Sequence, residues 1–211
     1  MGAPEFLTTF QVQVARVFFG LRASDGYLVA GGAGLLASDL IARPTDALDL
    51  FASAPTTSVT EARQALLQAL HQREYDVTVL HDSPTFCRLV VGHEGDETLL
   101  DLAIDAPPNR PPTVTLLGPT LAPLELAGRK LLALFGRAEA RDFADVYVLV
   151  RRFGKDALLE QAQSLDAGFD REVLAQMMAT LGRFADDEIP LAASDVRLAK
   201  AFFTQWADEL P

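Results

Sequence analysis

The sequence of 211 residues is poor in cysteine and histidine. Its one cysteine, Cys87, excludes an internal disulfide, so a reducing cytoplasm is the compartment we expect. Cys87 lies in an apolar run, residues 85–91, which favours a buried structural thiol over a nucleophile. The three histidines share no metal-ligand spacing, and we assign them no role.

Long apolar runs are missing as well. No run approaches the roughly 18–20 apolar residues that a membrane-spanning helix needs. The N-terminus lacks the basic and apolar regions of a secretory signal, and residues 1–6 are interpreted in part as a cloning remnant. We therefore expect no contact with a membrane.

Positive charge is scarce, because 18 lysines and arginines stand against 29 aspartates and glutamates, a formal net charge of −11. This argues against a protein that coats nucleic acid by bulk electrostatics, since phosphate binding needs clustered Lys and Arg. A local basic groove stays possible. Seven basic residues gather in the C-terminal half, where charge alone favours a solvated helix face: Arg129, Lys130, Arg137, Arg141, Arg151, Arg152 and Lys155.

Hydrophobic residues make up 49% of the chain and charged residues 22%, which is the balance of a globular protein. Periodicity and capping residues predict three helices in the first half, at residues 6–21, 33–40 and 58–73. Strands are predicted in the same half, at residues 27–30, 43–51, 76–81, 85–91 and 97–104.

Residues 106–112 contain four prolines, which block ladders and helices and mark a boundary. Beyond them only helices are predicted, at about residues 122–135, 139–153, 156–165, 170–184 and 194–210. Strands grouped first and helices last indicate an α+β fold. We predict an α/β lobe over residues 1–112 and a helical lobe over residues 113–211.

The first candidate site feature is a glycine pair, Gly31 and Gly32, between a predicted strand and a predicted helix. Glycines at this place let the backbone approach a phosphate, whose charge is favoured by the free N–H groups at a helix start. A glycine pair alone is a weak signal, because a tight turn without a ligand uses the same residues.

The next predicted strand carries acids in the run Thr45-Asp46-Ala47-Leu48-Asp49. Residues two apart in a strand share a face, so Ala47 and Asp49 point the same way and Asp46 points oppositely, unless a bulge re-aims it. Nucleotidyl transfer commonly uses Mg²⁺, or Mn²⁺, held by two carboxylates of such a pair. One of the two positions is alanine here, so the site is incomplete.

A further acid, Asp101, lies in the apolar run at residues 99–104 of a probable central strand. A carboxylate in such surroundings needs a metal, a charged partner or access to water. The residues themselves leave a functional and a structural role equally open.

The ordered set of motifs resembles the AbiEii nucleotidyltransferase toxins, with the MenT toxins as the nearest branch. The resemblance covers about residues 28–149: the glycine pair, Arg-Pro-Thr before the acidic strand, Leu-Asp-Leu, Gly-Arg-Lys at 128–130 and Arg-Asp-Phe-Ala-Asp at 141–145. It implies a DNA-polymerase-β-like nucleotidyltransferase lobe, a helical lobe that completes the active-site cleft, and a cognate antitoxin protein as partner. MenT-like members transfer nucleotides, often pyrimidines, from NTP to the 3′ acceptor end of tRNA, which blocks translation.

Matched by position, the resemblance assigns Gly31 and Gly32 to the triphosphate and places Thr45 beside it; in some members the antitoxin phosphorylates that hydroxyl. Asp49 matches the second aspartate of the metal pair, and Ala47 stands at the first. A naturally degenerate member and an engineered inactive variant would both carry such an alanine. In either case catalysis should fall sharply while the fold persists.

The resemblance also assigns residues in the helical lobe. Lys130 matches a lysine that contacts the nucleotide phosphates, and Arg141, Asp142 and Asp145 match an Arg-Asp-x-x-Asp segment. An ion pair along the helix is the structural alternative for that segment. The resemblance favours functional roles for Lys130 and Asp145.

The leading hypothesis is a toxin that modifies tRNA, with Asp49 and Asp101 holding Mg²⁺ and Lys130 holding phosphate. Two alternatives stay open. The same lobe could modify a protein or small-molecule hydroxyl, or the chain could be a non-catalytic homologue that binds a partner.

Overall fold

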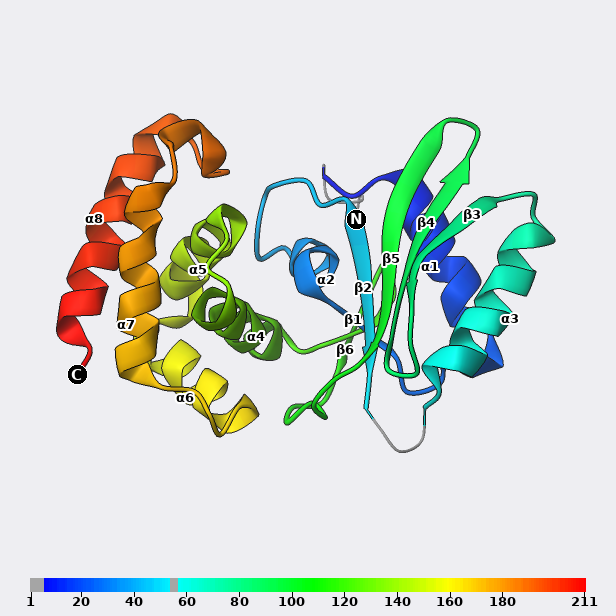
Figure 1. Ribbon diagram of the computed structural model, residues 1–211, viewed down its shortest axis with the longest axis horizontal. Helices are drawn as coiled ribbons and strands as arrows, with labels where there is room; N and C mark the ends of the chain where they lie inside the picture. The colour runs from blue at the N-terminus through cyan, green and yellow to red at the C-terminus, as the bar shows by residue number, and fades with distance from the viewer. Residues whose placement is uncertain (1–5, 54–56) are drawn as a thin grey trace. The chain divides into compact units, whose positions relative to one another are not determined.

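The structure is a computed structural model that describes residues 6–53 and 57–211, so residues 1–5 of the segment interpreted as a cloning remnant lie outside the described residues. The chain divides into two compact units, Met1–Pro123 and Leu124–Pro211. Each unit is built differently: the first around a sheet, the second from helices (Figure 1).

The described residues of the first unit form a seven-stranded sheet with the order β3-β4-β5-β2-β1-β7-β6. The strands are β1 (Leu28–Ala30), β2 (Ala47–Ala52), β3 (Asp76–Asp82), β4 (Phe86–His93), β5 (Asp96–Ile104), β6 (Thr113–Thr115) and β7 (Gly118–Thr120). The helices are α1 (Thr9–Phe19), the 3-10 turn η1 (Arg22–Ser24), α2 (Gly31–Ala37) and α3 (Val59–His71). Strands and helices together confirm the predicted α+β class.

Helices α1 and α3 lie on one side of the sheet and α2 on the other (Figure 1). Both long helices begin at capping side chains: Thr8 forms a reciprocal box with Gln11, and the Ser58 hydroxyl accepts from the Glu61 N–H at 3.2 Å. Such caps satisfy backbone donors that a helix start leaves open. The predicted start of α3 at Ser58 is thereby confirmed.

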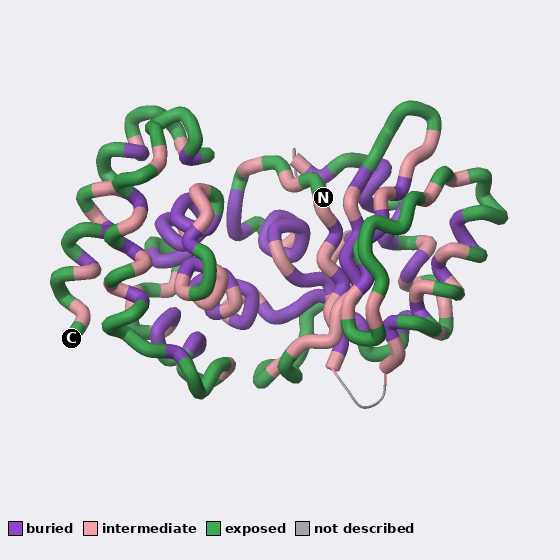
Figure 2. Tube along the Cα trace, viewed as in Figure 1, coloured by how far each residue is buried: buried purple, intermediate pink, exposed green. Residues whose placement is uncertain are grey.

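Strand β2 is fully buried on one face only. Along β2, Leu48 and Leu50 are fully buried while Ala47 and Asp49 are half-buried, and the edge strand β3 is largely exposed (Figure 2). Burial of each such leucine contributes about 1.5–3 kcal/mol, which fixes the face that the strand turns to the core. The predicted alternation is confirmed, and it leaves Asp49 on the face away from the core.

Three sequence-based boundaries need correction. Strand β2 begins at Ala47, not at residue 43, because Pro44 has no N–H for a ladder and residues 43–46 form a loop. Helix α2 begins at Gly31 itself, so the glycines form its first turn. The helix predicted over residues 170–184 changes at Thr180 from α-helix to a 3-10 turn.

Strands also continue beyond the prolines, where only helices were expected. The short strand β7 pairs in parallel with β1 and antiparallel with β6, so the sheet extends past residue 112. Three-residue strands show too little periodicity to be predicted from sequence. The division between the units accordingly falls at Pro123, after the predicted boundary at residue 112.

The described residues of the second unit are helical. They form α4 (Pro123–Gly136), α5 (Ala140–Phe153), α6 (Lys155–Leu165), α7 (Arg171–Ala179), η2 (Thr180–Arg183), η3 (Asp186–Glu188) and α8 (Ala193–Glu209). Phe143 of α5 meets Phe203 of α8 edge-on at 5.2 Å, and Trp206 stacks on Phe203. Such aromatic contacts anchor the last helix.

Composition led to expectations about membrane-spanning helices and about Cys87. Among the described residues, no helix has both the length and the apolar character needed to cross a membrane. Cys87 is fully buried on β4, and burial raises the pKa of its thiol, as expected of a structural cysteine.

Candidate active site

The glycine pair lies against the two acidic-strand residues that the sequence singled out. Gly31 has φ of +55°, and a Cβ there would come within 1.8 Å of Asp49 Oδ2; a Cβ on Gly32 would come within 2.8 Å of Thr45 Oγ1. Only glycine therefore leaves room for both side chains. The structure brings Gly31, Gly32, Thr45 and Asp49 together, as expected.

The loop before β2 is held from two sides. Gln11 of α1 donates from Nε2 to the Thr45 carbonyl at 2.6 Å, and the Leu99 N–H donates to the Asp46 carbonyl at 2.9 Å. Strand β2 then pairs with β5 in unbroken register from Ala47 to Ala52. The register shows no bulge between Ala47 and Ala52, and Asp46 lies in the loop before the strand, so Ala47 is the β2 residue at the position where we predicted a missing carboxylate.

Asp49 and Asp101 are partners in the parallel register of β2 and β5. Residues paired in this way project from the same face of a sheet, so the two carboxylates are neighbours. Asp101 is almost fully buried and Asp49 is half-buried. The leading hypothesis placed Asp49 and Asp101 together as metal ligands, but the residue-to-residue register was not predicted, because it depends on which strands become neighbours.

Asp101 has a charged partner on its other side, Arg88 of β4, which is its partner in the antiparallel register. Arg88 donates from Nε to Oδ1 at 2.8 Å and from Nη2 to Oδ2 at 2.6 Å. These hydrogen bonds raise the pKa of the guanidinium, and the charges of Asp101 and Asp49 add to the effect. The buried carboxylate that we expected to need a metal or a partner therefore has a partner.

The acidic side chains of the sheet are the candidate ligands for Mg²⁺. Within residues 6–53 and 57–211, no group of three or more His, Cys, Asp or Glu side chains is placed to hold a metal ion. Mg²⁺ is often bound through one or two carboxylates and completed by substrate phosphates and water. Asp49 and Asp101 fit such an ion, and Ala47 leaves the set one carboxylate short.

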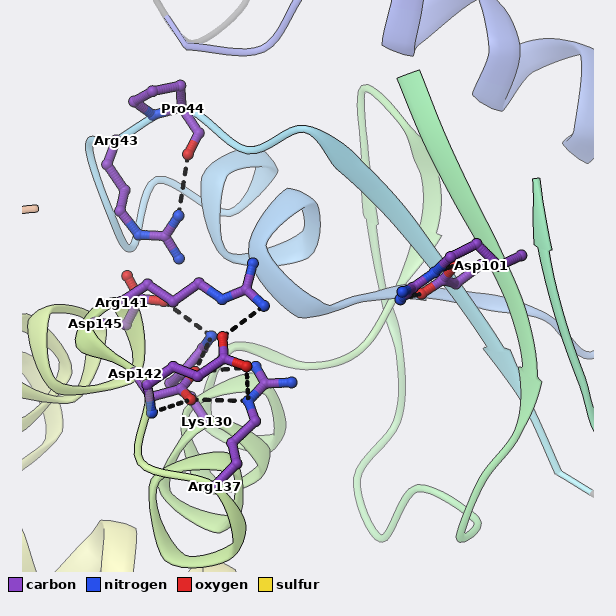
Figure 3. A network of polar contacts seen from close by, with 10 residues as sticks. Arg43, Pro44, Asp101, Lys130, Arg137, Arg141, Asp142 and Asp145 are labelled. Atoms are coloured by element: carbon purple, nitrogen blue, oxygen red, sulfur yellow. Dashed lines mark hydrogen bonds and ion pairs between the residues drawn. The ribbon is translucent and has the colours of Figure 1, made fainter. Parts of the chain in front are cut away.

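In the second unit, Lys130 of α4 lies among carboxylates of α5 (Figure 3). Its ammonium is 2.9 Å from Asp145 Oδ2 and 3.2 Å from Asp142 Oδ1. All three side chains are buried, so the charges can persist only because they compensate one another. The structure thus joins Lys130 and Asp145, two of the residues assigned by resemblance.

Asp142 accepts several hydrogen bonds in addition to its ion pair with Lys130. It accepts from Arg137 Nε at 2.9 Å and Nη2 at 3.1 Å, and from the Glu139 backbone N–H at 3.2 Å. Burial alone would raise the pKa of Asp142, but the hydrogen bonds from Arg137 and the charges of Lys130 and Arg137 outweigh it and lower the pKa. Asp142 is therefore a fixed anion at pH 7.

Arg141 lies at the surface of α5 and its Nη2 is 2.7 Å from Glu139 Oε2. Other members of the basic cluster also have acidic partners: Arg129 pairs with buried Glu125, and Lys155 pairs with Glu209. Acids thus offset much of the positive charge that gathers in the C-terminal half. The structure leaves the role of Arg141 in nucleotide binding as a prediction.

The residue that sequence reasoning missed is Arg88. The signal was present, because residues 86–91 alternate and Arg88 falls on the opposite face from Cys87 and Leu89. The turn at residues 94–95 sets a hairpin register that pairs Arg88 with Asp101. A prediction of the hairpin register would have found the ion pair.

The fold is found in solved nucleotidyltransferases. A candidate nucleotidyltransferase from H. pylori matches with a TM-score of 0.63 and 15% identity, over 96% of each chain. JHP933 from Helicobacter pylori matches with a TM-score of 0.60 and 16% identity, over 96% of this chain and 94% of that one. The solution structure of the antibiotic-resistance factor ANT(2'')-Ia matches with a TM-score of 0.50 and 15% identity, over 75% of this chain and 92% of that one.

At these identities the likeness concerns the fold alone, and the fold class is that of the nucleotidyltransferases. The family model described as "Nucleotidyl transferase AbiEii toxin, Type IV TA system" matches residues 22–209. The chain therefore belongs to the AbiEii family of nucleotidyltransferase toxins, whose type IV toxin–antitoxin systems imply an antitoxin partner. No curated protein matches the sequence.

Proposed function

We propose that this AbiEii protein acts as the MenT toxins do, transferring pyrimidine nucleotides from NTP to the 3′ acceptor end of tRNA in the cytoplasm. The observation that carries the proposal is Asp49, which abuts Gly31 on one side and is registered with Asp101 on the other. The acceptor and the base are taken from the resemblance of the motifs. A tRNA extended at that end cannot be aminoacylated, so translation stops.

The transfer needs few groups from the protein. The 3′ hydroxyl loses its proton to solvent as its oxygen forms a bond to the α-phosphorus, the bond from that phosphorus to the oxygen bridging to the β-phosphate breaks, and pyrophosphate leaves. Asp49 and Asp101 would hold Mg²⁺ or Mn²⁺, which neutralises phosphate charge when bound. Gly31 and Gly32 would let the backbone approach the triphosphate, with Thr45 beside it.

In the helical unit, we assign phosphate contacts to Lys130 and Arg141. Lys130 is a point charge whose direction is set by Asp145 at 2.9 Å. Asp145 would keep the ammonium in place. A lysine held in this way needs no reorganisation when the phosphate charge develops, which favours transfer.

We further propose that Ala47 impairs this chain. Ala47 and Asp49 occupy the same face of β2, and only Asp49 offers an oxygen ligand. The fold would not suffer, because an alanine at a half-buried strand position is readily accommodated. An antitoxin could still bind such a chain, since partner binding does not require catalysis.

The test is to restore the carboxylate. Ala47→Asp and the matched uncharged control Ala47→Asn are incubated with tRNA, Mg²⁺ and each α-³²P-labelled NTP in turn. We expect Ala47→Asp to label tRNA at least about 100-fold faster than Ala47→Asn, because outer-shell partners of a metal alone change activity by 10–100-fold. CTP or UTP should be the preferred donor.

The other hypotheses predict different outcomes. Label on protein or on a small alcohol, with none on tRNA, would replace tRNA by another acceptor. Absence of label with every NTP and acceptor, while Ala47→Asp stays folded and binds its antitoxin tightly, would point to the non-catalytic homologue.

A further inference from the structure

Arg88 bonds both carboxylate oxygens of Asp101. The fork of Nε and Nη2 reaches Oδ1 and Oδ2 at 2.8 and 2.6 Å. A divalent ion held between Asp49 and Asp101 would need one of the same two oxygens. The guanidinium and the ion therefore compete for Asp101.

The two partners of this ion pair differ in their freedom to move. Asp101 is 5% exposed and is fixed on a central strand, whereas Arg88 is 45% exposed on β4. The guanidinium also lies 5.6 Å from the centroid of the Phe86 ring, two residues earlier on the same strand. This cation–π contact would stabilise the Arg88 guanidinium after it leaves Asp101.

Charge favours such an exchange. Arg88 places a positive charge on Asp101, beside the two carboxylates that the strand register makes neighbours. Arg88 compensates the charge of buried Asp101 when no metal is bound, and its two hydrogen bonds occupy both carboxylate oxygens. The ion pair thus orients Asp101 and blocks it at the same time.

We propose that Arg88 is a positioning residue that occupies Asp101 until a divalent ion displaces it, and that it thereby sets the metal affinity of the site. The proposal rests on the proposed function in one respect, the use of Asp49 and Asp101 as ligands. It concerns metal binding and not the choice of acceptor.

The test measures Mn²⁺ binding to the full chain at pH 8 by electron paramagnetic resonance of free Mn²⁺. Arg88→Met removes the competing fork and keeps an apolar stem of similar length. We expect its Kd for Mn²⁺ to be at least about tenfold lower than in the unsubstituted chain, which corresponds to 1.4 kcal/mol. Arg88→Lys keeps the charge without the fork and should give an intermediate Kd.

Two controls separate the local effect from a general change in charge. Arg16 is exposed on α1, on the side of the sheet away from Asp49, so Arg16→Met changes the net charge equally and should leave the Kd unchanged. Adding Asp101→Asn to Arg88→Met should abolish the gain in affinity for Mn²⁺. An equal gain in Arg16→Met, or a gain that survives Asp101→Asn, would overturn the proposal.

A measurement on the unsubstituted chain covers the case in which Arg88→Met does not fold. The Nε–H resonance of Arg88 is followed by NMR during titration with Mg²⁺, assigned by its absence from Arg88→Lys. We expect the resonance to shift and to exchange faster with water as Asp101 is released. An unmoved resonance at saturating Mg²⁺ would overturn the proposal.

The outcomes also separate this proposal from the proposed function. Equal Mn²⁺ affinity with and without Arg88 overturns the role of Arg88 and leaves nucleotidyl transfer to tRNA standing. Tighter Mn²⁺ binding by Arg88→Met, with no transfer by Ala47→Asp to any acceptor, supports the role of Arg88 and rejects the transfer.

Discussion

Each of the two units holds a group of charged side chains, and the two groups differ in charge balance and in exposure to solvent. The strand cluster consists of Asp49, Asp101 and Arg88. The helix cluster consists of Lys130, Arg137, Asp142 and Asp145. Acids outnumber bases in the strand cluster, whereas two acids meet two bases in the helix cluster.

Exposure differs in the same sense. In the strand cluster Asp49 is half-buried and Arg88 is 45% exposed, so an ion can reach the carboxylates. In the helix cluster Lys130, Asp142 and Asp145 are buried and joined by ion pairs, while the side chain of Arg137 is 48% exposed. An open cluster with surplus negative charge suits a cation, while a closed and balanced cluster keeps its own members in place. The comparison predicts that substitutions in the helix cluster change stability, whatever they do to phosphate binding through Lys130, and that those in the strand cluster change metal binding with little effect on stability.

The largest effect on stability should follow removal of the buried ammonium in Lys130→Met. Methionine nearly keeps the volume but leaves Asp142 and Asp145 buried without this cation. Breaking a buried ion pair from one side costs about 3–5 kcal/mol, so the free energy of unfolding in urea should fall by that amount. Lys155→Met is the control, because Lys155 pairs with Glu209 near the surface and its loss should cost about 1 kcal/mol or less. Equal losses in the two variants would show that the helix cluster is not a closed network.

A smaller effect, with a definite pH dependence, is expected for Asp142→Asn. The pKa of Asp142 is lowered in the folded chain, so its contribution is complete above its unfolded pKa of about 3.9 and is lost as the pH falls through the lower folded value. At pH 7 Asp142→Asn should be less stable by about 1.5–3 kcal/mol, the range for hydrogen bonds to charged groups. Urea titrations should show this gap closing below about pH 4. If the difference in free energy of unfolding between the two chains stays constant down to pH 2, the charge of the Asp142 carboxylate does not contribute to that difference.

The two clusters also differ in what the sequence could predict. Alternation in Leu48-Asp49-Leu50 was enough to place Asp49 on the face away from the core, because the strand period is local. The closeness of Asp49 to Gly31 followed from the order of the motifs. Partners in different strands were another matter: Arg88 meets Asp101 through the register of a hairpin that single-strand periodicity does not fix.

In the helix cluster, the pairing of the side chains could not be predicted from the sequence. Spacing along one helix suggested an ion pair of Arg141 with Asp142 or Asp145, whereas Asp142 and Asp145 meet Lys130 of another helix. Contacts between helices depend on how side-chain ridges pack, which local spacing does not specify. Resemblance of the motifs drew attention to Lys130 and Asp145, and the structure supplied Asp142 and Arg137 as their neighbours.

The smallest effect on stability is expected for Asp49→Asn in the strand cluster. It is the same substitution, aspartate to asparagine, as Asp142→Asn in the helix cluster. The amide keeps the shape of Asp49 against Gly31 and removes one of two like charges on neighbouring strands. Such pairs change stability by about 0.2–1 kcal/mol, so the free energy of unfolding should move by less than about 1 kcal/mol. The affinity for Mn²⁺ should nevertheless fall at least about tenfold, because a neutral amide is a weaker ligand for a hard cation. A loss of stability as large as that of Asp142→Asn would contradict the difference between the two clusters. Asp49 would then stabilise the fold as Asp142 does.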